Sequence, residues 1–233
     1  MTALTFTLKT NPTFKLDCGN LTPNRLAGLS LDEIANLKLL LHRNSPKVAD
    51  YFDINLEEIN QKNKSGSNSS QIIFSNATSQ LDYIGYKMSS GQIIINGDAG
   101  DFLGAKLHGG SIVCRGNAGD RLGDTMRRGL ILVEGNAGDY TASRVIAGTI
   151  GILGSTGVYA GYAMRRGTVL LARKPTLHAT IQDCGTHTLP FLNLLFKSFE
   201  GLSAKFSSIA NNRVQRFAGD LASNGNGEIL VFK

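Results

Sequence analysis

The apolar positions of this chain recur with a 19-residue period between Met88 and Arg173, without insertion or deletion. Four full units and a partial fifth each contain a short run rich in Ile, Val and Leu. Such runs, bounded by glycines, predict β-strands rather than helices. They are Ile93–Ile95, Ile112–Cys114, Ile131–Val133, Ile150–Ile152 and Val169–Leu171. A fixed period of this length is typical of stacked repeats in which each unit forms one coil.

Glycine recurs in the same registers. In each unit, a glycine stands three residues after the first residue. Further along the unit, three small residues follow the pattern G-x-x-G-x-x-x-G, and Ala142 replaces the last glycine of this pattern in one unit. Glycine reaches left-handed and tightly packed conformations freely, so we expect the corners of each coil to turn on glycines. The prediction is a mainly β protein, a right-handed parallel β-helix with 19-residue coils about 4.8 Å apart.

Stacked coils would place equivalent side chains in rows. We expect three rows to point inward, beginning at Ile93, Ile95 and Met88 and following the 19-residue period. The intervening row should point outward, because side chains alternate along a strand. That row is also apolar, and strands apolar on both faces are normally covered on both. Either the chain's own terminal segments or another protein should cover it. The row is Ile94, Val113, Leu132, Gly151 and Leu170.

A polar row runs beside these apolar ones. Asp82, Asp101, Asp120 and Asp139 share one register, and Asp98, Asn117, Asn136 and Ser155 share another. We interpret the carboxylates as caps on backbone N–H groups at a solvated corner, as Asp and Asn are used in turns. An evenly spaced row does not provide the converging ligands that a divalent ion requires. We therefore predict no metal site here.

The flanks differ from the repeats, which divides the chain into three predicted parts. Residues 1–70 form a small N-terminal α/β lobe and linker, residues 71–175 the β-helix, and residues 176–233 a C-terminal capping segment. Short edge strands or a hairpin are expected near Phe6 and Phe14. Ser30 and Glu33 form a capping box for a helix that should end before Pro46. A polar linker is expected at 63–70 and a degenerate coil at 72–87. Leu189–Phe199 should seal the end of the prism, and Glu228–Phe232 could be a closing strand.

The net charge is +6, and part of it occupies matching registers. Arg127 and Arg128 share their two slots with Arg165 and Arg166, and His108 lies in the first slot one coil earlier. Such a row could bind a polyanion or an acidic protein surface. It could equally be a solvated face whose arginines pair with the aspartates or with Glu134. Lys87, Lys106 and Arg144 share another slot. Nucleic acid is disfavoured, because we see no interleaved aromatic residues for base stacking.

Catalytic signatures are absent from the sequence. There is no phosphate-binding loop, and the glycines follow the 19-residue period instead of a nucleotide-binding motif. Asp183, Cys184 and His187 lie close together, but no third orienting group is evident, and we favour a polar turn leaving the solenoid. We predict no catalytic residues and no covalently bound cofactor. With three scattered cysteines, no signal peptide and no membrane-spanning run, a cytoplasmic location is expected.

The G-x-x-G-x-x-x-G coils resemble the glutamate synthase C-terminal β-helix domain and, more closely, the C subunit of formylmethanofuran dehydrogenase. The flanks decide between these two families. Leu21-Thr22-Pro23, the segment from Leu26 to Ile34, and Cys184-Gly185 through Leu192 look like the lobes of this C subunit. The resemblance covers most of the chain, and the short, cysteine-poor sequence looks like the bacterial form.

The resemblance implies a non-catalytic subunit of an enzyme complex in one-carbon metabolism. In the bacterial formyltransferase/hydrolase complex, a formyl group passes from tetrahydromethanopterin to a methanofuran analogue and is hydrolysed to formate at a zinc site on another subunit. The implied partners are a zinc amidohydrolase-like hydrolase, a formyltransferase and a further subunit. Arg127, Arg128, Arg165, Arg166 and His108 would contact the polyglutamyl carrier or an acidic partner. The alternatives are a subunit of a molybdenum or tungsten dehydrogenase, and a scaffold without carrier contact.

Overall fold

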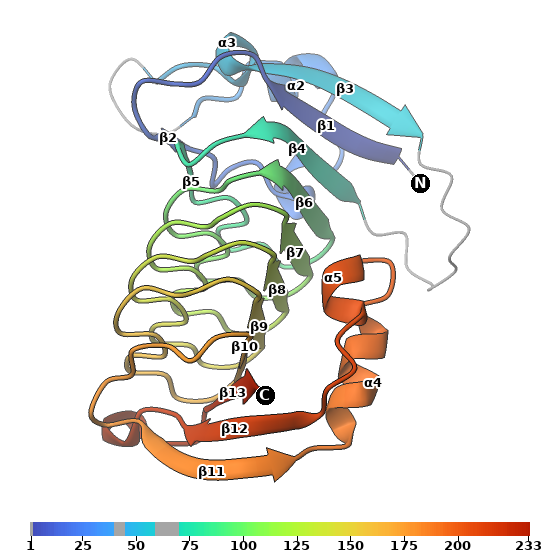
Figure 1. The fold of residues 1–233 in the computed structure, drawn as a ribbon. Helices are drawn as coiled ribbons and strands as arrows, with labels where there is room; N and C mark the ends of the chain where they lie inside the picture. Colours follow the sequence, from blue (N-terminus) through green and yellow to red (C-terminus); the bar gives the residue numbers. More distant parts are fainter. Residues whose placement is uncertain (1, 40–44, 59–69) are drawn as a thin grey trace.

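The computed structural model describes residues 2–39, 45–58 and 70–233. Eleven strands form one mostly parallel sheet in the order β11-β12-β13-β10-β9-β8-β7-β6-β4-β1-β3 (Figure 1). Those formed by the repeats are β6 (Gln92–Gly97), β7 (Ser111–Cys114), β8 (Leu130–Val133), β9 (Thr149–Ile152) and β10 (Thr168–Leu171). The flanks add β1 (Thr2–Leu8), β3 (Phe52–Glu58), β4 (Gln71–Ala77), β11 (Gln182–Thr188), β12 (Arg213–Ala218) and β13 (Glu228–Phe232).

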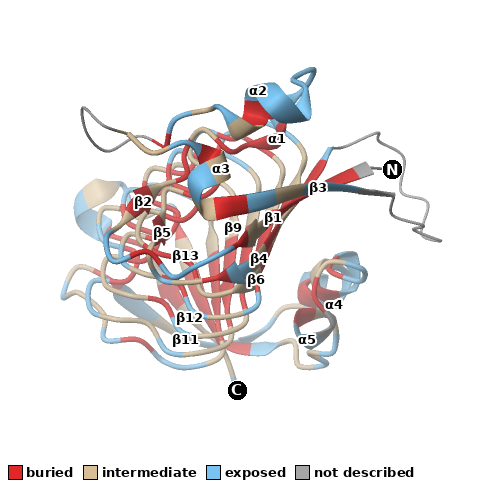
Figure 2. Cartoon of the chain, turned by 90° about the horizontal axis from the view of Figure 1, so that it is seen from above, coloured by how far each residue is buried: buried red, intermediate tan, exposed pale blue. Residues whose placement is uncertain are grey.

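The 19-residue register predicted from the sequence is confirmed. Strands β6 to β10 pair in parallel, with each residue opposite its equivalent in the next repeat, as Ile93 is opposite Ile112. A second line of parallel bridges joins Ala99 to Ala118, Ala118 to Ala137, and Ala137 to Thr156. The coils therefore stack directly on one another. All three inward rows are buried, and Figure 2 shows the buried residues concentrated along the strands.

The reason for the repeated glycines was only partly predicted. Gly104, Gly123 and Gly161 do adopt positive φ. Gly119 does not, and a Cβ there would lie 2.2 Å from Asp101 Oδ1 of the preceding coil. A Cβ at Gly138, Gly157 or Gly100 would likewise lie 2.0–2.2 Å from the Oδ1 atom of an aspartate in the preceding coil. These glycines are therefore required by close contact between coils. Several corners instead turn on larger residues at positive φ, among them Phe102, Arg121, Tyr140 and Tyr159.

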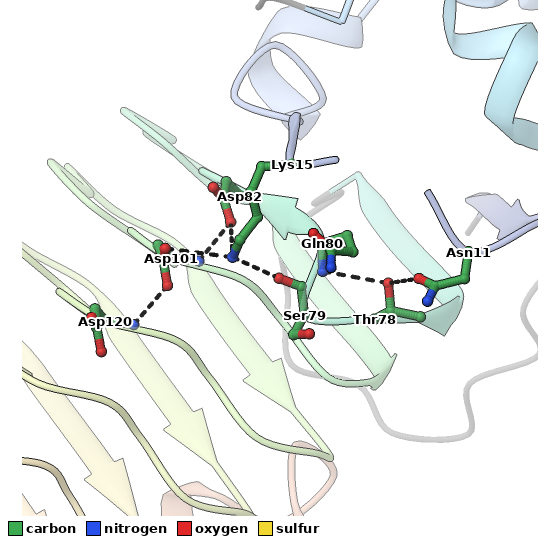
Figure 3. Close-up of polar contacts among 8 residues, drawn as sticks. All are labelled: Asn11, Lys15, Thr78, Ser79, Gln80, Asp82, Asp101 and Asp120. Carbon is green, nitrogen blue, oxygen red and sulfur yellow. Dashed lines mark hydrogen bonds and ion pairs between the residues drawn. The ribbon is translucent and has the colours of Figure 1, made fainter. Parts of the chain in front are cut away.

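The aspartate row caps the backbone as predicted. Asp82, Asp101 and Asp120 each accept, through Oδ1, the N–H of the next aspartate in the row at 2.8–2.9 Å. Asp139 accepts from Val158 N at 2.8 Å. At the start of the row, Lys15 Nζ lies 3.0 Å from Asp82 and 3.4 Å from Asp101 (Figure 3). Burial opposes the Lys15 charge, but the hydrogen bond and charge of Asp82, with those of Asp101, raise its pKa.

The chain's own C-terminal segment covers most of the outward apolar row. Val113, Leu132 and Leu170 are fully buried against Phe196 of α4 (Phe191–Ser198) and Phe206 of α5 (Ala204–Ser207), together with Leu192, Phe199, Val214 and Leu230. Figure 1 shows both helices alongside the strands. The prediction that Leu189–Phe199 seals the end of the prism is therefore wrong, since this segment packs on the sheet face. Because the C-terminal segment already buries Val113, Leu132 and Leu170, these side chains are not available for contact with a catalytic subunit.

The closing strand was predicted correctly. Strand β13 pairs in parallel with β10, with Thr168 opposite Glu228, and β12 and β11 continue the sheet antiparallel. The turn before β13 contains the short 3₁₀ helix η1 (Leu221–Ser223).

At the other end, β1 lies between β3 and β4 in the sheet and does not form an edge strand. Strand β2 (Leu16–Asp17) pairs with β5 (Leu81–Asp82) of the degenerate coil. The capping box at α2 (Leu31–Ala35) is confirmed, but the helix ends at Ala35, earlier than expected. Helices α1 (Pro23–Leu26) and α3 (Val48–Tyr51) complete this part.

Both flanks share one sheet with the repeats, and the division of the chain into three parts stays a prediction. Residues 63–69 of the expected linker lie outside the described residues. Within the part of the chain that the structure describes, no helix is long and apolar enough to cross a bilayer.

Candidate functional site

The predicted basic residues project from one corner of the stack. Arg127 N and Arg128 N both donate to Leu107 O of the preceding coil, at 2.8 and 3.2 Å, and Arg165 N and Arg166 N both donate to Val145 O. These bonds fix the backbone against the coil below, while all four side chains are exposed. The two pairs lie two coils apart, which is about 9–10 Å at the spacing of paired strands.

None of these four guanidinium groups has an ion-pair partner among the described residues. Glu134, one suggested partner, lies 3.0 Å from Lys205 Nζ and accepts the Ser203 hydroxyl at 2.6 Å. The aspartates accept backbone N–H groups, and two of them also pair with Lys15. The alternative in which the arginines are neutralised internally is therefore not supported, and their charge is directed to the solvent.

A cleft of about 620 Å³ opens beside this row. His108 and Arg128 line it, together with Pro23 and Asn24 of α1. The Asn24 side-chain oxygen accepts the N–H of Ser89 at 3.2 Å, which holds α1 against the first coils. The rest of the lining is largely Ser and Gly, so backbone groups are accessible next to two basic side chains. Arg165 and Arg166 do not line this cleft.

The second basic slot is already occupied by internal contacts. The ammonium groups of Lys87 and Lys106 lie over the Tyr86 ring, at 5.1 and 5.6 Å from its centroid. Arg144 forms an ion pair of 2.6 Å with Asp124, whose side chain is only 6% exposed. The hydrogen bond and the charge of Asp124 raise the pKa of Arg144. Arg127, Arg128, Arg165 and Arg166 therefore differ from this second slot, because no ion pair or ring contact engages their guanidinium groups among the residues that the structure describes.

The Asp183–His187 segment is not the polar turn that we expected. It lies in β11, an edge strand of the sheet, at a bulge. His187 Nε2 contacts the carbonyl oxygen of Cys184 at 2.9 Å, so these residues do not form a thiol–imidazole pair. The N–H of Gly185 donates to Asp183 and, with Gln215, lowers the pKa of that carboxyl. Across the described ranges, no group of three or more His, Cys, Asp or Glu residues is placed to hold a metal ion.

One row of residues was overlooked in the sequence. Tyr83, Phe102, Arg121, Tyr140 and Tyr159 follow one another at the 19-residue period and form a continuous stack. Tyr83 and Phe102 stack with ring centroids 4.7 Å apart, and Tyr140 and Tyr159 at 5.0 Å. The Arg121 guanidinium lies between them, 5.9 Å from the Phe102 centroid and 4.9 Å from that of Tyr140. The period itself was the signal that could have revealed this row.

A solved structure resembles this chain over nearly its whole length. It is a crystal structure of the formyltransferase/hydrolase complex (FhcABCD) from Methylorubrum extorquens, in complex with methylofuran. The similar chain in it is 34% identical, with a TM-score of 0.67, and the match covers 97% of this chain and 98% of that one. This chain belongs to the C-subunit family of formylmethanofuran dehydrogenase.

Curated members of this C-subunit family match over a shorter region. The C subunit of tungsten-containing formylmethanofuran dehydrogenase 2 from Methanococcus maripaludis is 30% identical over 100 residues, which is 43% of this chain and 34% of that protein. Its counterpart from Methanocaldococcus jannaschii is 38% identical over 64 residues, which is 28% of this chain and 21% of that protein. The match thus spans about a third or less of these relatives. No family model matches the chain.

Proposed function

We propose that this protein is the carrier-binding, non-catalytic C subunit of a cytoplasmic formyltransferase/hydrolase complex. In such a complex, a formyl group moves from tetrahydromethanopterin to a methanofuran analogue and is then hydrolysed to formate. The partners would be a zinc amidohydrolase-like hydrolase, a formyltransferase and a further subunit. The observation that carries this proposal is the similarity, over 97% of the chain, to a complex crystallised with methylofuran.

The fold suits a coupling role. We propose that the stacked coils form a right-handed parallel β-helix with a 19-residue coil, between an N-terminal lobe and a C-terminal capping segment. Each coil contacts its neighbours through rows of buried side chains and through the aspartate caps, which makes a rigid prism. A rigid prism can hold two catalytic subunits at a fixed separation while a tethered carrier moves between them.

The four exposed arginines and His108 are the proposed carrier contacts. A polyglutamyl chain presents carboxylates along its length, and the guanidinium group binds carboxylates through two parallel hydrogen bonds. The four guanidiniums are exposed and have no carboxylate partner within residues 2–39, 45–58 and 70–233, so binding a carrier would break no ion pair there. The cleft beside His108 and Arg128 could receive part of the same chain.

The test is charge reversal at two coils together, Arg127→Glu with Arg165→Glu, in the complete complex. We expect the amount of carrier that co-purifies to fall roughly 10-fold or more, because exposed charge contacts contribute about 0.2–1 kcal/mol each and reversal adds repulsion. Carrier retention by the unmodified complex should also fall as the salt concentration rises, since salt screens exposed charges. Carrier content is measured by mass spectrometry of the released molecule.

Two controls separate carrier binding from general damage. Arg213 is exposed on β12, so Arg213→Glu reverses a charge away from the row. The paired change Arg127→Lys with Arg165→Lys keeps the charge and loses only the forked geometry. Normal carrier content and normal activity in the doubly reversed complex would reject carrier contact and favour the purely structural scaffold.

The second candidate is the C subunit of a molybdenum or tungsten formylmethanofuran dehydrogenase, and the names of the curated relatives favour it. The coverage weighs against it, because the match includes 98% of the chain from the hydrolytic complex but about a third or less of the dehydrogenase subunits. Elemental analysis of the purified complex separates the two candidates. Tungsten or molybdenum in stoichiometric amount would favour the dehydrogenase, and zinc alone the hydrolase.

A further inference from the structure

A second cleft, of about 520 Å³, lies at the corner occupied by the stacked row. Its walls are aromatic. Tyr140 and Tyr159 meet Tyr162 edge to face, at centroid distances of 6.0 and 6.2 Å, and His178 lies 5.7 Å from Tyr162. None of the five proposed carrier contacts lines this cleft. It is therefore a separate surface from the basic row.

The cleft carries an unpaired positive charge. Arg121 and Arg144 both line it, but Asp124 neutralises Arg144. Arg121 is held between two rings and has no carboxylate partner among the described residues. A guanidinium stacked in this way keeps its N–H groups available at the edge of its plane, where a carboxylate can accept two of them.

Apolar surface continues from the cleft. An adjoining hollow of about 340 Å³ shares Tyr159 and His178 and adds Val158 and Leu177. Val158 is 41% exposed, and Tyr159 and Tyr162 are each 40% exposed. Exposed tyrosines beside an arginine and an aliphatic patch have the composition of the energetically important centre of protein interfaces.

We propose that this surface, defined by Arg121, Tyr140, Val158, Tyr159, Tyr162 and Leu177, docks an acidic segment of a partner subunit. One Asp or Glu carboxylate of the partner would bind Arg121, and a neighbouring apolar side chain would cover Val158 and Leu177. The charge favours an acidic partner, because Arg121 is left unpaired within the described residues. The inference rests on membership of a complex, which is part of the proposed function, but it does not depend on carrier binding.

The first test is the Arg121→Glu variant of the complex. The complex is purified by an affinity tag on this chain, and native mass spectrometry measures which subunits it retains. Repulsion of the docked carboxylate should weaken retention of one defined subunit at least 10-fold, with that subunit lost on dilution. The charge-matched control is Arg213→Glu, which should keep every subunit. Should Arg121→Glu lower the melting temperature of the isolated chain, Val158→Arg tests the same surface from its apolar side.

The second test identifies what lies against position 121. The Arg121→Lys variant is treated with a carbodiimide, which joins an amine to a carboxylate without a spacer, and the product is digested and sequenced by mass spectrometry. A crosslink from position 121 to an Asp or Glu of a partner subunit supports the proposal. A crosslink to glutamates of the carrier, or full subunit retention in both Arg121→Glu and Val158→Arg, overturns it. The proposed carrier site would fail separately, by normal carrier content after reversal of Arg127 and Arg165.

Discussion

The contact between coils can be tested by adding a single methyl group. Gly119→Ala places a Cβ 2.2 Å from Asp101 Oδ1 and 2.8–2.9 Å from the backbone of residues 100 and 101. Ordinary van der Waals contact begins at 3.4 Å, so either the carboxylate must retreat from the new methyl group or the two coils must separate. Either movement disrupts the 2.9 Å bond from Asp120 N to Asp101 Oδ1.

The expected cost follows from these two effects. Overpacking a tight contact costs about 1–3 kcal/mol. Loss of a hydrogen bond to a charged group adds about 1.5–3 kcal/mol. Alanine recovers about 0.4–1 kcal/mol by restricting the unfolded chain. We therefore expect Gly119→Ala to lower the free energy of unfolding by about 3 kcal/mol.

Gly185→Ala is the matched control. Gly185 has φ +84°, but a Cβ there would meet no atom within 4 Å. Only backbone strain opposes this change, at about 1–2 kcal/mol. Urea unfolding followed by circular dichroism gives both values. The double variant Asp101→Ala with Gly119→Ala should cost less than the sum of the single changes, because the clashing carboxylate is gone. A cost for Gly119→Ala no larger than that for Gly185→Ala, or strict additivity with Asp101→Ala, would refute the contact explanation.

Four further predictions concern buried groups. Asp124→Ala should cost about 3 kcal/mol in urea unfolding, near the lower end for a broken buried pair because the Arg144 side chain is 52% exposed. Phe206→Ala should cost about 3–5 kcal/mol and increase binding of a hydrophobic dye, since it uncovers the outward apolar row; an unchanged midpoint would contradict this cover. Cys18 and Cys114 should resist alkylation in the native protein while Cys184 reacts, because burial raises the pKa of both Cys18 and Cys114, the latter to about 12. An unfolded thiol ionises near 8.5, so the free energy of unfolding should fall as pH rises from about 8.5 toward 12, and a flat profile there would count against the shift.

Much of the stacked, mostly parallel sheet could be predicted from the sequence. Side chains one period apart had to be alike if the coils stacked, so the period gave the strands, their register and the inward rows. A local signal sufficed at the Ser30–Glu33 capping box. The aspartate caps followed from the period, because the donor and the acceptor lie one coil apart. The period also contained the stacked row through Arg121, which we overlooked.

Other features depended on contacts between distant parts of the chain. The apolar row at Leu132 required a cover, but only the tertiary structure showed that α4 and α5 provide it. Gly151 interrupts that row because a Cβ there would lie 2.7 Å from the ring of Phe206, far along the chain. Glu134 pairs with Lys205, which leaves Arg127 and its equivalents without this partner. A repeat specifies which residues stack, since each coil repeats the environment of the last. It does not specify which non-repeating segment folds back over them, because that depends on the shape and charge of the finished surface.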